Sequence, residues 1–259
     1  MTANPTYVCQ VPVSRLRSMP THQSEMVSQL VFGDRCQVLS YERDQWVKIK
    51  IAYDGYEGWV TPSHLAGPEE AQPDGQPEAF TTKWSTRVLI NGKAMHLPLG
   101  ACLTGIKKGQ LQLGNNLIGY SGPTMDPQKI PVNRKLMQKF AFLFLNTPYL
   151  WGGKTVFGVD CSGFTQSLFR LFNIKLLRDA HQQASQGVPL DPLSQGRFGD
   201  LAFFDNPKGR ITHVGVLLGN GKIMHASGHV RIDALDDQGI INQSNFMRTH
   251  QLKQINRYM

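Results

Sequence analysis

The chain has 259 residues, of which 41% are hydrophobic and 18% are charged, so it is too long for one small module and has the composition of a globular rather than a disordered protein. The 27 Lys and Arg residues exceed the 19 Asp and Glu residues and give a net charge of +8, which favours anionic partners. The basic residues form no block of the kind that marks a nucleic-acid-binding arm, so we expect no nucleic-acid partner.

The N-terminal segment lacks the apolar core of a secretory signal, and the densest apolar run, residues 140–145, is far shorter than a membrane span. We therefore expect no membrane association. The predicted location is the cytoplasm if the sequence is complete, and the periplasm or the exterior if a leader was removed.

The four cysteines are widely spaced and form no CxxC pair, so they indicate neither a zinc site nor a redox site of that type. Three of them, Cys9, Cys36 and Cys102, are expected to be small buried hydrophobic residues. Only Cys161 has neighbours that suggest chemistry.

Residues 6–66 alternate apolar and polar positions in short runs that are broken at turn residues such as Gly33-Asp34 and Asp54-Gly55. This pattern predicts a small all-β barrel. The segment resembles bacterial SH3 domains in its VFGD turn, its WVKIKI strand, and its GYEGWV strand followed by TPSHL.

A stretch rich in Pro, Gly and acidic residues follows at 69–79 and is predicted to be a surface linker. Residues 80–130 again show short strands with glycine breaks and no helical period. We expect a second, degenerate SH3-like barrel there.

The periodicity changes after Pro131. Residues 133–148 carry apolar positions at helical spacing, with Asn133 as a candidate N-cap, and a second helix is predicted to begin at Cys161. From Gly199 onward the period is two, so helices are followed by an antiparallel meander, which is typical of an α+β domain.

A thiol at a helix N-terminus is easier to ionise, and the thiolate is the attacking species in nucleophilic catalysis. Such a nucleophile also needs a base. The candidates are His213 and His225, which both fall in predicted strands.

The turn between these strands decides whether the two imidazoles can meet. A two-residue turn at Asn220-Gly221 would pair Ile223 with Leu218 and place His213 and His225 on opposite faces. A three-residue turn would pair Leu218 with Lys222 and Gly215 with His225, and both imidazoles would then share one face. The catalytic interpretation therefore requires an odd turn or a bulge.

In that arrangement His213 takes the proton of Cys161, and His225 fixes the tautomer of His213. The residues alone leave alternatives open: Cys161 as a buried thiol, and the histidines as satisfied core groups or as zinc ligands together with His229 and Asp160.

Taken together, residues 134–235 resemble the NlpC-type cysteine peptidases, a papain-like family of bacterial peptidoglycan hydrolases. The resemblance is carried by the segments TPYLWGG, GVDCSGF, LLRDAHQQASQG, GDLAFF and ITHVGVLLGNGKIMHASG, in the order of the family. It implies hydrolysis of the bond between γ-D-glutamate and the diamino acid of peptidoglycan stem peptides. It also implies that Cys161, His213 and His225 are nucleophile, base and third polar residue, without metal or cofactor.

The resemblance further implies that the acyl side of the cleft is lined by Tyr149, Trp151, Asp160 and Ser162. The N-terminal SH3-like segment is similar to that of a subgroup that acts on peptides with a free L-alanine amine. There, Asp179 would receive the ammonium, with Tyr56 and Glu25 completing the pocket. The sequence departs from this subgroup at Ala180, where a hydroxyl residue is common.

Each assignment has a structural alternative: Asp179 as a helix cap, Tyr56 and Trp59 as barrel packing, and Glu25 as a solvated side chain. The predicted architecture is an α+β, papain-like NlpC domain preceded by two small all-β SH3-like barrels, in a protein expected to be a monomer. Its predicted boundaries are 1–68, 69–79, 80–130 and 131–259. The rival functions are an inactive wall-binding protein, a zinc hydrolase and, less well supported, a module that binds Pro-rich peptides.

Overall fold

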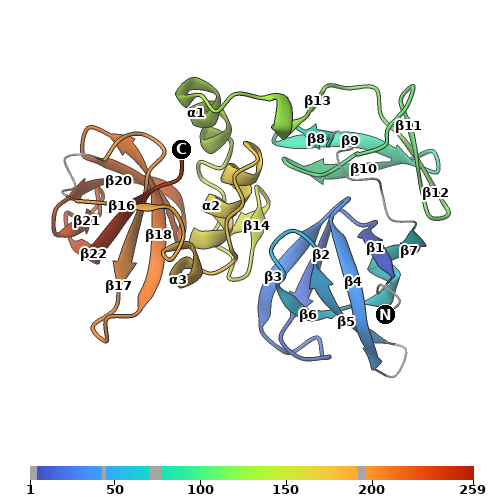
Figure 1. The fold of residues 1–259 in the computed structure, drawn as a ribbon, viewed down its shortest axis with the longest axis horizontal. Coiled ribbons are helices and arrows are strands. Elements are labelled where there is room, and N and C mark those ends of the chain that lie inside the picture. The colour runs from blue at the N-terminus through green and yellow to red at the C-terminus, as the bar shows by residue number, and fades with distance from the viewer. Residues whose placement is uncertain (1–4, 43–44, 70–77, 192–195) are drawn as a thin grey trace. The chain divides into compact units, whose positions relative to one another are not determined.

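The computed structural model describes residues 5–42, 45–69, 78–191 and 196–259, and it divides into two compact units (Figure 1). The first unit comprises Met1–Pro131 with Lys154–Val156, and the second comprises Val132–Gly153 with Phe157–Met259. The predicted linker at 69–79 falls almost entirely on residues outside the described part of the chain.

The N-terminal part of the first unit is one antiparallel sheet with the strand order β3-β2-β6-β5-β4-β1-β7. Its alternating apolar residues point to one core, as the register Cys36↔Ile51 and Val38↔Ile49 shows. The strands are β1 (Thr6–Cys9), β2 (Val13–Arg17), β3 (Met26–Val31), β4 (Arg35–Glu42), β5 (Trp46–Ile51), β6 (Glu57–Val60) and β7 (Leu65–Glu69), with a 3-10 turn at Pro62–His64.

The rest of the first unit forms a four-stranded sheet in the order β10-β9-β12-β11 and a two-stranded ribbon of β8 and β13. A second barrel remains a prediction, because these strands make two separate sheets. The strands are β8 (Phe80–Thr81), β9 (Ser85–Ile90), β10 (Lys93–Pro98), β11 (Gln110–Leu113), β12 (Asn116–Gly119) and β13 (Thr124–Met125), followed by a 3-10 turn at Pro127–Lys129.

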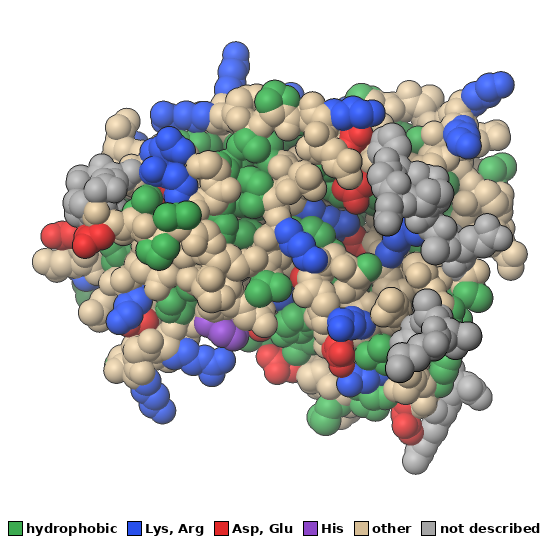
Figure 2. Space-filling view, in the orientation of Figure 1, with side chains coloured by type: hydrophobic (Ala, Val, Ile, Leu, Met, Phe, Trp, Pro, Cys, Tyr) green, Lys and Arg blue, Asp and Glu red, His purple; other side chains and the backbone are tan. Residues whose placement is uncertain are grey.

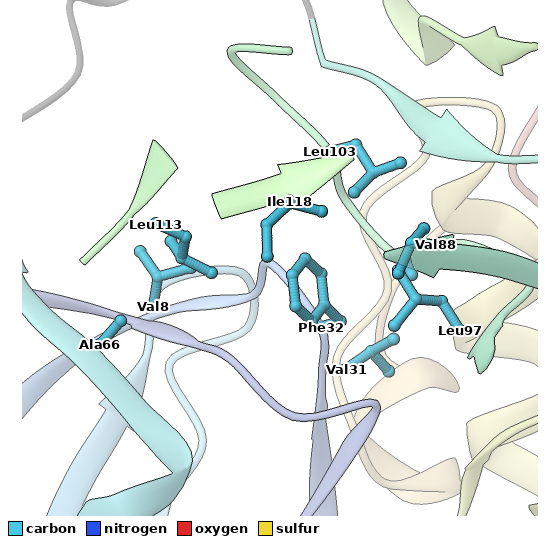
Figure 3. Packing of buried hydrophobic residues seen from close by; sticks show 10 residues of the cluster. Val8, Val31, Phe32, Ala66, Val88, Leu97, Leu103, Leu113 and Ile118 are labelled. Carbon is cyan, nitrogen blue, oxygen red and sulfur yellow. The ribbon is translucent and has the colours of Figure 1, made fainter. Parts of the chain in front are cut away.

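These two parts of the first unit share a hydrophobic core (Figure 3). Phe32, fully buried, lies among side chains of the second part such as Val88, Leu97 and Ile118. The backbone N–H of Cys102 donates to the carbonyl of Phe32 at 2.8 Å. The N-terminal sheet thus has one core of its own and a second cluster that it shares with the rest of the unit.

The second unit begins with α1 (Arg134–Leu143), whose N-cap is Asn133, as predicted: its side chain accepts from the N–H of Leu136 at 2.8 Å. Two further helices, α2 (Cys161–Arg170) and α3 (Ala180–Gln183), follow, and α2 packs against β18 and β19. Between α1 and α2 lie the short strands β14 (Lys154–Thr155) and β15 (Gly158–Val159).

The C-terminal sheet has the order β16-β22-β17-β18-β19-β20-β21, and β22 also pairs with β21, so six of its strands close into a barrel. One face of these strands forms a core that includes Phe204, Leu217, Ile223 and Leu235. The strands are β16 (Val188–Leu190), β17 (Leu201–Asp205), β18 (Ile211–Gly219), β19 (Lys222–Ser227), β20 (His229–Asp236), β21 (Gly239–Ile241) and β22 (Arg248–Arg257).

On the face of the molecule in Figure 2, the Lys and Arg side chains are scattered among polar and apolar atoms rather than gathered in one block. No helix within the described ranges is both long enough and apolar enough to cross a membrane.

Candidate active site

The N-terminus of α2 is held by a buried carboxylate. Asp160, the N-cap residue, accepts from the N–H of Gly163 at 2.6 Å and from the N–H of Gly152 at 2.8 Å. Arg178 donates to both oxygens of this carboxylate at 3.1 and 2.6 Å, and to the hydroxyl of Ser162 at 2.9 Å. Because Arg178 and Asp160 are both buried, this pair fixes the first turn of the helix rigidly.

Cys161 is the first residue of α2, as the sequence predicts. Its Sγ lies 4.0 Å from the carbonyl oxygen of Thr212, and the backbone of Val214 also hydrogen-bonds to the thiol. The sulfur therefore lies beside the backbone on both sides of His213.

The protonation state of this thiol differs from the expectation. Burial, followed by the charge of Asp160, raises the pKa of the Cys161 thiol to about 12, although backbone hydrogen bonds from Val214 and Ser162 lower it. Desolvation thus outweighs the favourable position at the helix N-terminus. At neutral pH the resting site holds a thiol, not a thiolate.

The predicted register that brings the two histidines to one face is confirmed. Gly215 pairs with His225, and Leu217 pairs with Ile223. Of the two expected alternatives, an odd turn and a bulge, the structure has the bulge: Leu218 does not pair with Lys222, and the turn is Asn220-Gly221, with φ of 51° and 63°.

Gly215 itself is required for this approach. A Cβ at position 215 would lie 2.9 Å from Cβ of His225 and closer still to Ile223. The glycine therefore leaves the space in which the ring of His225 reaches the ring of His213.

The two imidazoles form part of a chain of hydrogen bonds. His213 Nε2 lies 2.8 Å from His225 Nδ1, and His225 Nε2 lies 3.0 Å from Asp233 Oδ2. Arg231 Nη2 and the N–H of Gln243 both donate to Asp233 Oδ1 at 3.0 Å. The four side chains of this hydrogen-bonded series, His213, His225, Asp233 and Arg231, lie on one face of the consecutive strands β18, β19 and β20.

The pKa of Asp233 sets the direction of these bonds. Burial alone raises it, but hydrogen bonds from His225, Gln243 and Arg231 outweigh burial and lower it to about 2. The carboxylate is therefore ionised and can only accept, so His225 Nε2 carries a proton and donates.

His213 is neutral in this chain. Burial, followed by the neighbouring rings of His225 and His250, holds the pKa of His213 well below its ordinary value. When His225 carries one proton, on Nε2, its Nδ1 accepts from His213. The proton of His213 is then on Nε2, and its Nδ1 keeps a lone pair. A neutral imidazole with an unprotonated Nδ1 is a general base.

A third histidine, His250 of β22, stacks on the ring of His213 with centroids 4.1 Å apart and planes at 25°. Burial, followed by the charge of His225, lowers the pKa of His250 to about 4. His250 is thus neutral at physiological pH and covers one face of His213.

Of the residues predicted for the acyl side, Tyr149, Asp160 and Ser162 lie close to the thiol. Burial, then the charges of Cys161 and Asp160, raise the pKa of the Tyr149 hydroxyl. Trp151 is exposed nearby in the chain, whereas Asp160 and Ser162 are buried and hydrogen-bonded to Arg178.

Asp179 occupies the N-cap position of α3, which is the structural alternative raised for it. Its backbone N–H donates to the side chain of Gln182 at 3.0 Å, and its side chain is half-buried. Binding of a substrate ammonium by this carboxylate stays a prediction.

Glu25 and Tyr56 belong to the first unit. Glu25 is exposed, and Tyr56 is half-buried and packs against the core of the N-terminal sheet. Their proposed contact with substrate stays a prediction.

The sequence reasoning missed Asp233, Arg231, His250 and Arg178. A signal existed for the first two, because a turn at Gly228 pairs Ser227 with His229 and so His225 with Arg231. No local pattern marks the buried Arg178 or the stacking of His250, since both depend on tertiary contacts.

No group of three or more His, Cys, Asp or Glu side chains in the described ranges is arranged to hold a metal ion. The facing nitrogens of His213 and His225 are hydrogen-bonded to each other, which uses the lone pair that a shared metal ion would need.

Two protein families match the chain: the NlpC/P60 family over residues 146–249, and the bacterial dipeptidyl-peptidase SH3 domain over residues 16–65. A protein named gamma-D-glutamyl-L-lysine dipeptidyl-peptidase from Bacillus subtilis is 34% identical over 216 residues, which cover 77% of this chain and 71% of that protein. The chain belongs to the NlpC/P60 family.

Further NlpC/P60 relatives match most of the chain. A protein of the same name from Bacillus cereus is 27% identical over 86% of this chain and 74% of its own length. The crystal structure of an NlpC/P60 family protein from Bacillus cereus has the same fold, with a TM-score of 0.83, 21% identity and coverage of 98% of this chain and 99% of that one.

These matches confirm the NlpC-type resemblance, the SH3-like domain at the N-terminus and the expected enzyme class. As an NlpC/P60 protein, the chain is a cysteine peptidase.

Proposed function

We propose that this NlpC/P60 peptidase hydrolyses the bond between γ-D-glutamate and the L-diamino acid of peptidoglycan stem peptides, with Cys161 as nucleophile. The observation that carries the proposal is the placement of the Cys161 thiol beside the backbone of His213, whose Nε2 is bound by His225. The names of the Bacillus subtilis and Bacillus cereus relatives support this substrate class.

In the first half of the reaction, His213 Nδ1 takes the thiol proton as Sγ attacks the γ-carbonyl carbon of the D-glutamyl residue. Because the pKa of the thiol is raised, proton transfer accompanies the attack rather than preceding it. The oxyanion forms near the start of α2, where the N–H of Cys161 has no partner within the helix, and one such donor contributes about 2.7–4 kcal/mol in other hydrolases.

In the second half, the C–N bond breaks and His213 Nδ1 returns its proton to the leaving amine of the diamino acid. This leaves a thioester between Cys161 and the glutamyl residue. Water, deprotonated by His213, then hydrolyses the thioester and regenerates the thiol. His225 holds the ring of His213 throughout.

We further propose a preference for peptides with a free N-terminal L-alanine, which would suit a role in cell-wall recycling. Asp179 would bind the ammonium, and Tyr56 and Glu25 would complete the pocket. A buried cation requires a paired carboxylate, so such a pocket rejects peptides that lack the charge. Ala180 leaves this pocket without one hydroxyl group.

Tyr149 and Trp151 are proposed to contact the acyl part of the substrate. The sequence analysis assigned Asp160 and Ser162 to the acyl side of the cleft as well. Because both are buried and bonded to Arg178, we propose that they support this side of the cleft without contacting the substrate.

The test is to incubate the protein with L-Ala-γ-D-Glu-L-Lys or its diaminopimelate counterpart, each with a free or acetylated amine, and to identify products by mass spectrometry. Cleavage at the γ-glutamyl bond that is lost in Cys161→Ala and unaffected by chelators supports the proposal. No cleavage of any peptide would favour an inactive wall-binding protein, and loss with chelators that metal restores would favour a zinc hydrolase.

The pocket for the amine has its own control. Asp179→Asn keeps a good N-cap residue but removes the charge. We expect it to slow cleavage of the free peptide and not of the acetylated one. Equal turnover of the free and acetylated peptides by the unaltered protein would contradict the proposed preference.

A further inference from the structure

The carboxylate of Asp233 is buried behind the two histidines and has a different environment at each oxygen. Oδ1 accepts two hydrogen bonds, from Arg231 Nη2 and from the backbone of Gln243, both at 3.0 Å. Oδ2 faces His225 Nε2 at 3.0 Å, with Arg231 Nε at 2.9 Å. The side chain of Asp233 is 2% exposed, so no bulk water replaces these partners.

The arginine that holds Asp233 is itself fixed. Arg231 Nη2 also donates to the side chains of Asn242 at 2.9 Å and Ser244 at 3.2 Å. The segment after β21 therefore anchors the guanidinium, and the guanidinium together with the N–H of Gln243 fixes which oxygen of Asp233 meets the histidine.

From these contacts we infer that Asp233 is a positioning residue, which sets through His225 the ring nitrogen of His213 that carries the proton. This inference rests on the proposed roles of Cys161, His213 and His225. Each of the two hydrogen bonds, between Asp233 and His225 and between His225 and His213, has one donor and one acceptor. The group that Asp233 presents to His225 therefore determines whether Nδ1 of His213 carries a proton.

The other titratable groups near these histidines do not determine which nitrogen of His213 carries the proton. His250 stacks on His213 face to face and has its centroid 5.7 Å from that of His225. Cys161 lies at the other end of the chain, beside His213. Only Asp233 and Arg231 adjoin the far side of His225 in the described contacts.

The substitution Asp233→Asn makes a sharp prediction because of the two donors at Oδ1. The amide oxygen of Asn must take the Oδ1 position, where Arg231 and Gln243 donate. Its NH₂ group then faces His225 Nε2, which has to accept, and Arg231 Nε, which loses its ion-pair partner. The proton of His225 moves to Nδ1 and is donated to His213 Nε2, so the proton of His213 is left on Nδ1, the nitrogen that takes the thiol proton in the proposed mechanism.

A base with its proton already in place cannot take the proton of Cys161. In a serine protease triad the corresponding change keeps the geometry and lowers kcat about 10⁴-fold. Here we expect Asp233→Asn to lower kcat roughly 10³-fold with little change in KM, because the substrate contacts are untouched.

Two further variants separate the tautomer from the charge. Asp233→Ala removes the charge without presenting an NH₂ group, so its loss in kcat should be clearly smaller than that of Asp233→Asn. Asp236→Asn is the matched control, since Asp236 is on the same strand and is paired with Arg248 at 2.6 Å but meets no histidine. It should keep the activity of the unaltered protein.

The direct readout is ¹⁵N NMR of the imidazole rings, assigned with single histidine variants. At pH 7 the unaltered protein should show His213 with a protonated Nε2 and an unprotonated Nδ1, and Asp233→Asn should show the reverse. Equal loss in the Asn and Ala variants, or an unchanged tautomer in Asp233→Asn, would overturn the inference.

The NMR readout needs no substrate, so it separates this inference from the proposed function. If the peptides are not cleaved but the tautomers behave as described, the proposed substrate is wrong and the relay stands. If Asp233→Asn does not fold, a spectrum of the unaltered protein with the proton of His213 on Nδ1 would by itself refute the inference.

Discussion

Two buried aspartates, each paired with an arginine, lie near the proposed nucleophile Cys161 and the proposed base His213, and their contacts differ. Asp160 is bonded by backbone N–H groups and Arg178, and both of its oxygens are occupied by groups that hold the scaffold. Asp233 is held by Arg231 at both oxygens, but its Oδ2 also meets His225. An Asp–Arg pair thus holds the first turn of α2 at Asp160, whereas at Asp233 it faces the protonated Nε2 of His225.

The role of a buried carboxylate therefore depends on its hydrogen-bond partners, which are backbone N–H groups for Asp160 and an imidazole for Asp233. Asp160 has its strongest contacts within the framework and raises the pKa of the nearby Cys161 thiol. Asp233 accepts a hydrogen bond from the imidazole of His225. Replacing either aspartate should therefore affect different measurements.

The largest effect is expected from breaking the buried pair of Arg178 and Asp160. Arg178 is 1% exposed, so Arg178→Met leaves Asp160 as an uncompensated buried charge and should lower the free energy of unfolding by about 3–5 kcal/mol, measured by urea denaturation. Arg231 is partly exposed, at 18%, and Arg231→Met should cost clearly less.

The surface pair of Arg248 and Asp236 is the control for that measurement. Arg248→Met should leave the stability almost unchanged, because exposed ion pairs contribute little. Equal destabilisation by Arg178→Met and Arg231→Met would show that the two pairs do not differ in the way described.

The second effect concerns the link between Asp233 and the base. His225→Ala should lower kcat about 10²–10³-fold, because it removes the group that orients His213. His225→Gln can still accept the hydrogen bond from His213 Nε2 and should recover part of this loss. A His225→Ala variant with the original kcat would refute an orienting role.

The third effect is the pH dependence. His213 acts as a base when neutral, and since its pKa is held well below 6.5, kcat/KM should stay constant as the pH falls through 6.5 and decline only at lower pH. Because the pKa of the thiol is raised to about 12, alkylation of Cys161 by iodoacetamide should accelerate steadily from pH 7 to 9 without a plateau. A plateau near neutral pH would indicate a preformed thiolate instead.

The smallest effect concerns the stacked histidine. An aromatic pair contributes about 0.5–1.5 kcal/mol, so His250→Ala should lower kcat about 2- to 10-fold, and His250→Phe, which keeps the stack, should change it less. A larger loss in His250→Phe than in His250→Ala would show that the ring nitrogens of His250 matter and not its face.

The local parts of the site could be predicted from the sequence. The helix that starts at Cys161 follows from the spacing of Cys161, Thr165 and Leu168, all of which are buried. The common face of His213 and His225 follows from strand periodicity once a bulge is allowed. Glycine-rich turns do not reveal whether the extra residue is in the loop or in the strand, so the sequence left an odd turn and a bulge as alternatives, and the structure has the bulge at Leu218.

The parts that failed depend on burial and on contacts between distant segments. The expected easy ionisation of Cys161 considered only the helix terminus, whereas desolvation by surrounding residues dominates. Arg178 was passed over beside Asp179, since arginine is seldom buried, and only the folded chain shows that it pairs with Asp160. Cys9, Cys36 and Cys102 were correctly expected to be buried.

The hydrophobic cluster around Phe32 has a consequence for dissecting this protein. Because its side chains come from both halves of the first unit, residues 5–69 expressed alone would expose Val31 and Phe32 to water. The two halves should melt as one cooperative block, and an excised fragment that ends at the boundary between them should aggregate.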